Sequence, residues 1–160
     1  MTYFSSTKTQ AGFTLLELMV TLSIAAILAA IAVPTLQTIT INRHADGLAN
    51  DLQIDLMYAR NQALSLSKEV TIEPLSSGWS AGWTIKKDGD VIRQKGSTST
   101  PIAKTGEITS AASKISFDKH GRHAGSTTSI TIKVAKCTGN RVRTITLNPI
   151  GQLQTTSSSC

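Results

Sequence analysis

The chain has 160 residues, of which 40% are hydrophobic, 4% aromatic and 16% charged. This length suits one globular domain with at most one appendage, the apolar content excludes a disordered chain, and two cysteines are too few for a disulfide-dense mini-protein. Residues 101–160 carry the whole net charge of +6, so this part either meets an anionic partner such as nucleic acid or is an ordinary solvated surface.

An apolar run dominates the amino-terminal part. Residues 13–33 contain only four polar side chains: Thr14, Glu17, Thr21 and Ser23. As a helix the run is roughly 30 Å long, which is enough to cross the hydrocarbon core of a bilayer. Lys8, the charge that precedes it, favours a cytoplasmic amino terminus. The alternative is a buried core helix, whereas a secretory signal would be shorter and end in a small-residue cleavage site.

Glu17 and Pro34 are the unusual residues of this segment. A lone carboxylate is costly in lipid, and the run holds no basic residue, so the partner of Glu17 is a new amino terminus, another subunit or a proton. Pro34 lacks a backbone donor, yet apolar residues continue at spacings of four and three as far as Leu66. We therefore expect one long helix over residues 13–67, kinked near Pro34, whose second half packs on a domain.

From Val70 onward the pattern changes to that of short strands. Val70 and Ile72 alternate with polar residues, and residues 83–92 flank an Asp88-Gly89 turn, which predicts a hairpin. Further strands are expected over residues 115–117, 129–134 and 142–147. Residues 94–114 are rich in polar residues and are expected to form a loop. The predicted fold class is α+β, with an antiparallel sheet packed on the back half of the helix.

The segment Gly12-Phe13-Thr14-Leu15-Leu16-Glu17 resembles the cleavage and methylation site of type IV prepilins. The resemblance implies that a membrane prepilin peptidase cuts between Gly12 and Phe13 and methylates the amine of Phe13. It also implies that the helix, with Pro34 at the end of its apolar part, later packs in the core of a filament. There Glu17 would neutralise the Phe13 amine of a neighbouring subunit, and such a pair makes burial of both charges tolerable and fixes the axial register.

Later segments are similar to the GspH/FimT group of minor pilins and pseudopilins. They are residues 48–70, 78–83, 115–118 with Gly121-Arg122, and 144–151. The resemblance implies a type IV pilin-like fold, in which a long kinked amino-terminal helix packs its second half on an antiparallel β-sheet domain. Its parts would be a cleaved leader (1–12), a transmembrane and filament-core half-helix (13–34), an amphipathic half-helix (35–67) and a periplasmic β-rich domain (68–160). At least one of Trp79 and Trp83 is expected to pack in the core of that domain.

The function that this resemblance implies is assembly. A FimU/FimT-type minor pilin takes part in type IV pilus assembly or initiation, with other minor and major pilins, prepilin peptidase and inner-membrane lipid as partners. It would span the inner membrane once, with a cytoplasmic amino terminus and a periplasmic carboxy-terminal domain, and enter the pilus after assembly. The alternative within the same architecture is a GspH-type minor pseudopilin of a type II secretion system.

DNA binding for natural transformation is a further alternative, which we do not favour. Many FimT-type proteins carry a Gly-Arg-x-Arg element after the last strand, and in some it binds DNA. Here the matching residues are Gly151-Gln152-Leu153-Gln154, so neutral amides replace both arginines and the phosphate contacts are lost. Arg141 and Arg143 share one face of a strand, and with Lys133 and Lys136 they form the candidate weak DNA contact.

Cys137 and Cys160 lie in the part expected outside the cytoplasm, where disulfides persist. A bond would close a loop of about 24 residues, contribute about 3 kcal/mol in the chain-entropy model, and tie the polar tail 154–159 to the sheet. The alternative is two free thiols. His120 and His123 lack a third acidic ligand nearby and are interpreted as surface turn residues. The sequence holds no nucleophile motif or phosphate-binding loop, so we expect no enzyme, metal or cofactor.

Overall fold

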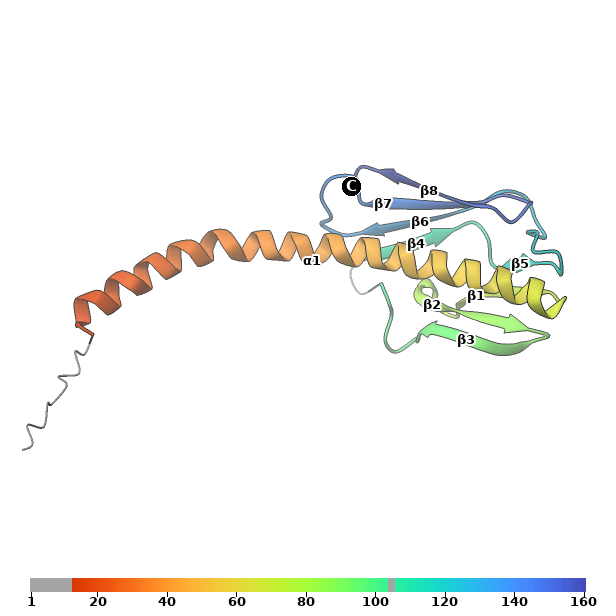
Figure 1. Ribbon diagram of the computed structural model, residues 1–160, viewed down its shortest axis with the longest axis horizontal. Helices are drawn as coiled ribbons and strands as arrows, with labels where there is room; N and C mark the ends of the chain where they lie inside the picture. The colour runs from red at the N-terminus through yellow and green to blue at the C-terminus, as the bar shows by residue number, and fades with distance from the viewer. Residues whose placement is uncertain (1–12, 104–105) are drawn as a thin grey trace, which may run out of the picture. The chain divides into compact units, whose positions relative to one another are not determined.

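The computed structural model describes residues 13–103 and 106–160 (Figure 1). It divides into an amino-terminal unit that ends at Gln37 and a carboxy-terminal unit, Thr38–Cys160. The single long helix α1 (Leu15–Leu66) contains Pro34 and matches the expected helix to within two residues at each end. A proline inside a helix removes one backbone hydrogen bond without ending it when the surrounding residues continue the pattern.

The polar residues of the amino-terminal unit are satisfied largely within α1. Thr14 Oγ1 accepts a hydrogen bond of 3.2 Å from the backbone N–H of Glu17, which is the contact of a helix N-cap. The hydroxyls of Thr21 and Ser23 donate to backbone carbonyls three and four residues earlier. By contrast, every described residue up to Gln37 is exposed, although most are apolar.

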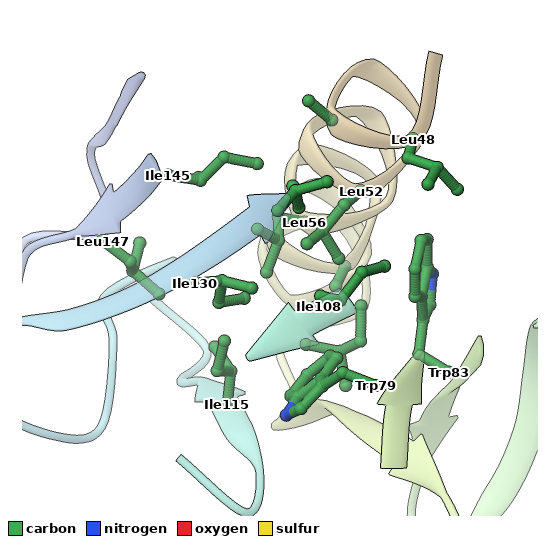
Figure 2. Packing of buried hydrophobic residues seen from close by; sticks show 14 of the residues in the cluster. Leu48, Leu52, Leu56, Trp79, Trp83, Ile108, Ile115, Ile130, Ile145 and Leu147 are labelled. Atoms are coloured by element: carbon green, nitrogen blue, oxygen red, sulfur yellow. The ribbon is translucent and has the colours of Figure 1, made fainter. Parts of the chain in front are cut away.

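In the carboxy-terminal unit α1 presents a narrow apolar face. Its buried residues are Ala45, Leu48, Ala49, Leu52, Asp55, Leu56, Ala59 and Ala63. These follow the spacing of four and three predicted from the sequence, except that Leu66 is exposed. Figure 2 shows the leucines of this face against residues from both sheets, including Trp83, Ile130 and Ile145.

Two four-stranded antiparallel sheets complete the unit. The first has the order β3-β2-β1-β5 and consists of β1 (Val70–Leu75), β2 (Gly78–Lys87), β3 (Asp90–Gly96) and β5 (Ile115–Phe117). The second has the order β4-β6-β7-β8 and consists of β4 (Gly106–Ser110), β6 (Thr128–Val134), β7 (Val142–Leu147) and β8 (Leu153–Ser158). The predicted hairpin is present as β2–β3, where Asp88 and Gly89 both have the positive φ that a two-residue turn requires.

The sequence analysis did not predict two of the strands, β4 and β8. Residues 94–114 are not a loop throughout, because they contain the end of β3 and the whole of β4, and the polar tail contains β8. β4 has one apolar residue, Ile108, which is buried, and β8 begins with Leu153 and continues with polar residues only. Neither shows the period of two on which strand prediction depends, because pairing with a neighbouring strand rather than burial defines them.

Candidate functional site

The structure describes the amino-terminal motif from Phe13 to Glu17, whereas Gly12 lies outside the described residues. Phe13 is exposed, and the carboxylate of Glu17 has no partner among residues 13–103 and 106–160. α1 is long and apolar enough to cross a membrane by length and composition, and its apolar window is not buried. A carboxylate on an exposed apolar helix requires either a counter-charge from elsewhere or a proton if lipid or protein covers that helix.

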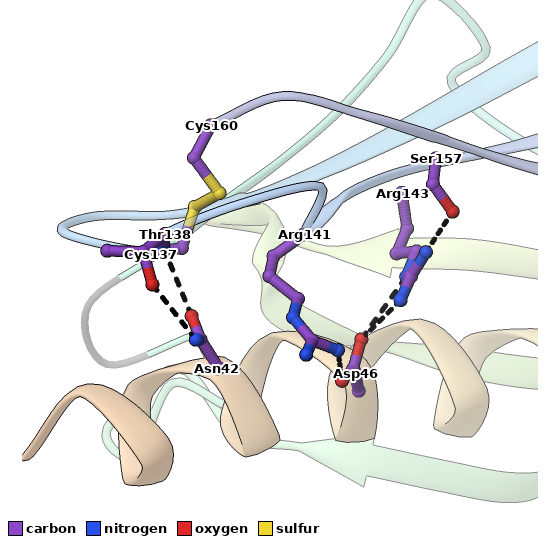
Figure 3. A network of polar contacts seen from close by, with 8 residues as sticks. All are labelled: Asn42, Asp46, Cys137, Thr138, Arg141, Arg143, Ser157 and Cys160. Carbon is purple, nitrogen blue, oxygen red and sulfur yellow. Dashed lines mark hydrogen bonds and ion pairs between the residues drawn. A yellow bond between two sulfur atoms is a disulfide. The ribbon is translucent and has the colours of Figure 1, made fainter. Parts of the chain in front are cut away.

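A polar network joins the carboxy-terminal part of the chain to α1 (Figure 3). Asp46 accepts from Nη1 of Arg141 at 2.6 Å and from Nη2 of Arg143 at 2.7 Å. One turn earlier, the amide of Asn42 donates to Oγ1 of Thr138 and accepts from its backbone N–H, both at 3.1 Å. The network therefore fixes the β6–β7 connection and β7 on the helix.

The pairing with Asp46 changes the interpretation of the candidate DNA contact. The sequence places Arg141 and Arg143 on one face, and the structure brings both to the same carboxylate. Their charge is thereby partly neutralised, whereas Lys133 and Lys136 remain exposed. Sequence reasoning did not predict that Asp46 binds these arginines. The one indication in the sequence was its position on the helix beside the buried Ala45.

Cys137 and Cys160 form a disulfide, with Cα atoms 5.8 Å apart. This separation lies within the range that a disulfide spans. The backbone N–H of Cys160 also donates to the carbonyl of Gly139 at 3.0 Å. The bond thus holds the end of β8 on the β6–β7 connection.

Cys160→Ser is expected to lower the melting temperature of the exported protein, since the unfolded chain loses a crosslink worth about 3 kcal/mol. Thermal unfolding followed by circular dichroism measures this change. Ser159→Ala is the control, because it alters the neighbouring residue and leaves the bond intact. Thiol alkylation of the native, unreduced protein should find no free cysteine, and two readily alkylated thiols would contradict the prediction.

A second polar cluster lies in the core. Asp55 of α1 is buried, and its Oδ2 accepts from Nε1 of Trp83 at 2.8 Å. Its Oδ1 lies 3.1 Å from Nε of Arg93, whose guanidinium stacks 5.0 Å above the ring of Tyr58. Trp79 and Trp83 are both buried, which confirms the prediction that at least one of them packs in the core. Asp55 was missed, although a carboxylate at an apolar position of an amphipathic helix is a signal of a buried polar contact.

The Asp118–Arg122 turn orders one of the segments similar to the GspH/FimT group. Asp118 Oδ1 accepts from the backbone N–H groups of Arg122 at 2.9 Å and His120 at 2.8 Å. The bond from Arg122, with its side chain, lowers the pKa of Asp118 to about 2. Because this pKa is below the ordinary value, the contribution of Asp118 to stability is complete above pH about 4 and is lost as the pH falls toward 2.

Two glycines of the same segments meet beside α1. A Cβ on Gly151 would lie 2.1 Å from the carbonyl oxygen of Gly121, and one on Gly121 would lie 2.9 Å from Leu64. Both have positive φ, which favours glycine. Arg60 Nε donates to the Gly121 carbonyl at 2.9 Å. These contacts therefore hold the chain at Gly121 and at Gly151 against α1.

The prediction for the histidines was wrong in one case. His120 is exposed, but His123 is buried, with Nδ1 3.1 Å from the carbonyl of Ser116. His123 lies there because the backbone N–H of Ala124 bonds to the Ser116 carbonyl and Phe117 bridges to His123, which holds this segment against β5. In the part of the chain that the structure describes, no three His, Cys, Asp or Glu side chains gather as metal ligands.

Comparisons with known proteins agree with this architecture. The family described as type II transport protein GspH matches residues 48–151, and the prokaryotic N-terminal methylation motif matches residues 7–33. No curated protein matches the chain by sequence.

Two crystal structures of the type IV minor pilin FimU of Pseudomonas aeruginosa have the same fold. Their TM-scores are 0.59 and 0.58, each at 19% identity. The matches cover 74% and 72% of this chain and 96% and 98% of the FimU chains. GspH-type and minor pilin proteins are structural proteins rather than enzymes, and the apolar helix with its methylation motif indicates membrane anchoring. The chain belongs to the GspH family and has the fold of a type IV minor pilin.

Proposed function

We propose that this protein is a minor pilin that takes part in the assembly or initiation of a type IV pilus. The observation that carries the proposal is the contrast within α1. Its second half packs on a FimU-like domain, whereas its described residues up to Gln37 are exposed and mostly apolar. Such a surface is stable in water only when lipid or other subunits cover it.

The processing and pairing steps follow from the amino-terminal motif. Prepilin peptidase cuts between Gly12 and Phe13 and methylates the new amine, with the amino terminus cytoplasmic and the domain periplasmic. Glu17 then pairs with the Phe13 amine of a neighbouring subunit. Pro34 marks the end of the segment that lipid, and later the filament core, covers.

A GspH-type pseudopilin of a type II secretion system is the second candidate. The description of the matching family favours it, and the helix chemistry is the same in both systems. Gene neighbourhood and the identity of the co-purifying subunits discriminate between them.

Crosslinking in membranes tests the proposed function directly. A photoreactive amino acid at Leu18, one position after Glu17, should yield adducts with other subunits that carry the prepilin motif. Pilus subunits among the adducts would support the minor pilin, and secretion-system subunits would support the pseudopilin. If the adducts contain lipid alone while the cell assembles filaments, the proposal is wrong.

DNA binding is expected to be weak. Since Asp46 partly neutralises Arg141 and Arg143, residual binding should rest on exposed lysines, with dissociation constants of about 10⁻⁴ to 10⁻⁶ M near physiological salt. Gel shifts of duplex DNA at two salt concentrations measure it. Gln152→Arg with Gln154→Arg should strengthen binding more than the charge-matched Gln94→Arg with Thr98→Arg. Tight binding by the unmodified protein at raised salt would favour a DNA receptor instead.

A further inference from the structure

β8 is the outer strand of the second sheet, and β7 is its one strand neighbour among the described residues (Figure 1). The hydrogen bond of 3.1 Å from the Asn148 N–H to the Gln152 carbonyl determines which residue pairs of β7 and β8 are hydrogen-bonded to each other. In an antiparallel pair, bonded and non-bonded residue pairs alternate. The register therefore turns the backbone N–H and C=O groups of Leu153, Thr155 and Ser157 away from β7.

The other three sheet edges are protected. β3 carries Asp90, Arg93 and Lys95, and charged residues discourage strand addition at an edge. The outer side of β4 is covered, because Ile108 N–H donates to Oγ of Ser80 at 2.9 Å.

The outer side of β5 is covered in a similar way. The Ser116 carbonyl accepts from Ala124 N–H at 3.0 Å, and Phe117 bridges to His123. β8 alone among the four edges has neither a charged residue nor a covering segment within the described residues.

β8 is also held in place before any partner arrives. The disulfide of Cys160 fixes its end, and Oδ1 of Asn148 accepts from Gln152 N–H at 2.8 Å before its start. Thr155 Oγ1 donates to Oε1 of Gln53 on α1 at 3.1 Å, and Ser157 bonds to Arg143. A strand already ordered loses little conformational entropy when it binds.

A cavity of about 210 Å³ lies at the start of β8. Met57, Gly151 and Leu153 line it together with the polar side chains of Gln53, Arg60, Asn61 and Gln152. The side chain of Met57 is half exposed, and Ile150 beside the cavity is 64% exposed. A partner segment beside β8 would cover this space and the exposed parts of both residues.

We propose that the edge of β8 binds an extended segment of a different pilin-like subunit, which adds a fifth strand and covers this cavity. The outward backbone groups require an extended partner, and β8 itself carries no charged side chain that would discourage strand addition. The proposal rests on the proposed function for the source of the partner.

A second copy of the chain fits less well. β8 runs antiparallel to α1, since its end lies near Asn42 and its start near Arg60. An antiparallel β8–β8 pair, the more stable arrangement, would reverse α1 in the second copy. Two subunits anchored in one membrane by the same end cannot adopt that arrangement.

Photo-crosslinking of the full chain in membranes tests the proposal, with a photoreactive amino acid at Gln154. Thr155→Pro removes an outward N–H but no bond to β7, so the domain should stay folded and oxidised. It should reduce the adduct about tenfold, because a backbone hydrogen bond to the partner is lost. Thr155→Val loses the hydroxyl bond to Gln53 but keeps the N–H, so it should reduce the adduct much less than Thr155→Pro does. The Cys137–Cys160 bond, detected by thiol labelling, reports folding in each variant.

The expected product is an adduct with a subunit that carries the prepilin motif. Formation of this adduct should depend on the N–H of Thr155. An undiminished adduct in the folded Thr155→Pro protein would overturn the proposal, as would an adduct between two copies of this chain. Absence of an adduct at Gln154 while Leu18 crosslinks to other subunits would overturn it and leave the proposed function intact. Failure at both positions would count against the proposed function itself.

Discussion

Glu17→Val is expected to reduce incorporation into filaments at least about tenfold while membrane insertion stays normal. Insertion is preserved because valine makes the segment more apolar. The helix start is preserved too, since Thr14 caps the backbone N–H of residue 17 rather than its side chain. Incorporation falls because the amine of the neighbouring Phe13 would be buried without a counter-charge, a loss of several kcal/mol. Immunoblots of sheared filaments and of membranes measure the two quantities.

Ser23→Val is the matched control for this variant. It also replaces a polar residue of the apolar segment with valine, but the Ser23 hydroxyl bonds within its own helix. Incorporation should therefore match that of the unmodified chain. Filaments that contain Glu17→Val at the normal level would remove the pairing with the Phe13 amine from the account.

Asp55→Ala is expected to destabilise the carboxy-terminal unit by about 3 kcal/mol. The change leaves Nε1 of the fully buried Trp83 without an acceptor and Arg93 without its anion. Asp55→Asn should cost less, because its amide oxygen can still accept from Trp83. Denaturant unfolding of a fragment of residues 38–160, followed by tryptophan fluorescence, measures the free energy of unfolding.

Asp51→Ala is the control for the buried site. Asp51 lies one turn earlier on α1 and pairs with Lys95 at 3.0 Å, with both side chains more than a third exposed. Such an ion pair contributes less than about 1 kcal/mol. Equal free energies of unfolding for Asp51→Ala and Asp55→Ala would show that the buried Asp55–Trp83 contact contributes no more to stability than the exposed Asp51–Lys95 pair.

The sequence predicted those elements that a local residue pattern defines. The apolar run and the stripe from Ala45 to Ala63 defined α1, because helix burial recurs every three to four residues. The Asp88-Gly89 turn defined the β2–β3 hairpin, because few residues adopt positive φ at both positions.

Contacts between distant residues could not be predicted in this way. Asp46 lies about 95 positions from the arginines that bind it, and no local pattern in α1 signals that pairing. β8 is a strand because β7 offers it a ladder and Cys160 holds its end, neither of which alters its own composition. The burial of His123 follows similarly from its contacts with β5 and with Pro149.

The proposed function requires that this chain is processed and assembled as a pilin. The intact mass and amino-terminal sequence of protein isolated from membranes that contain the native prepilin peptidase test it most directly. The expected chain has lost residues 1–12, begins at Phe13 and carries one added methyl group on the amine. A chain that keeps residues 1–12 under these conditions would contradict the account.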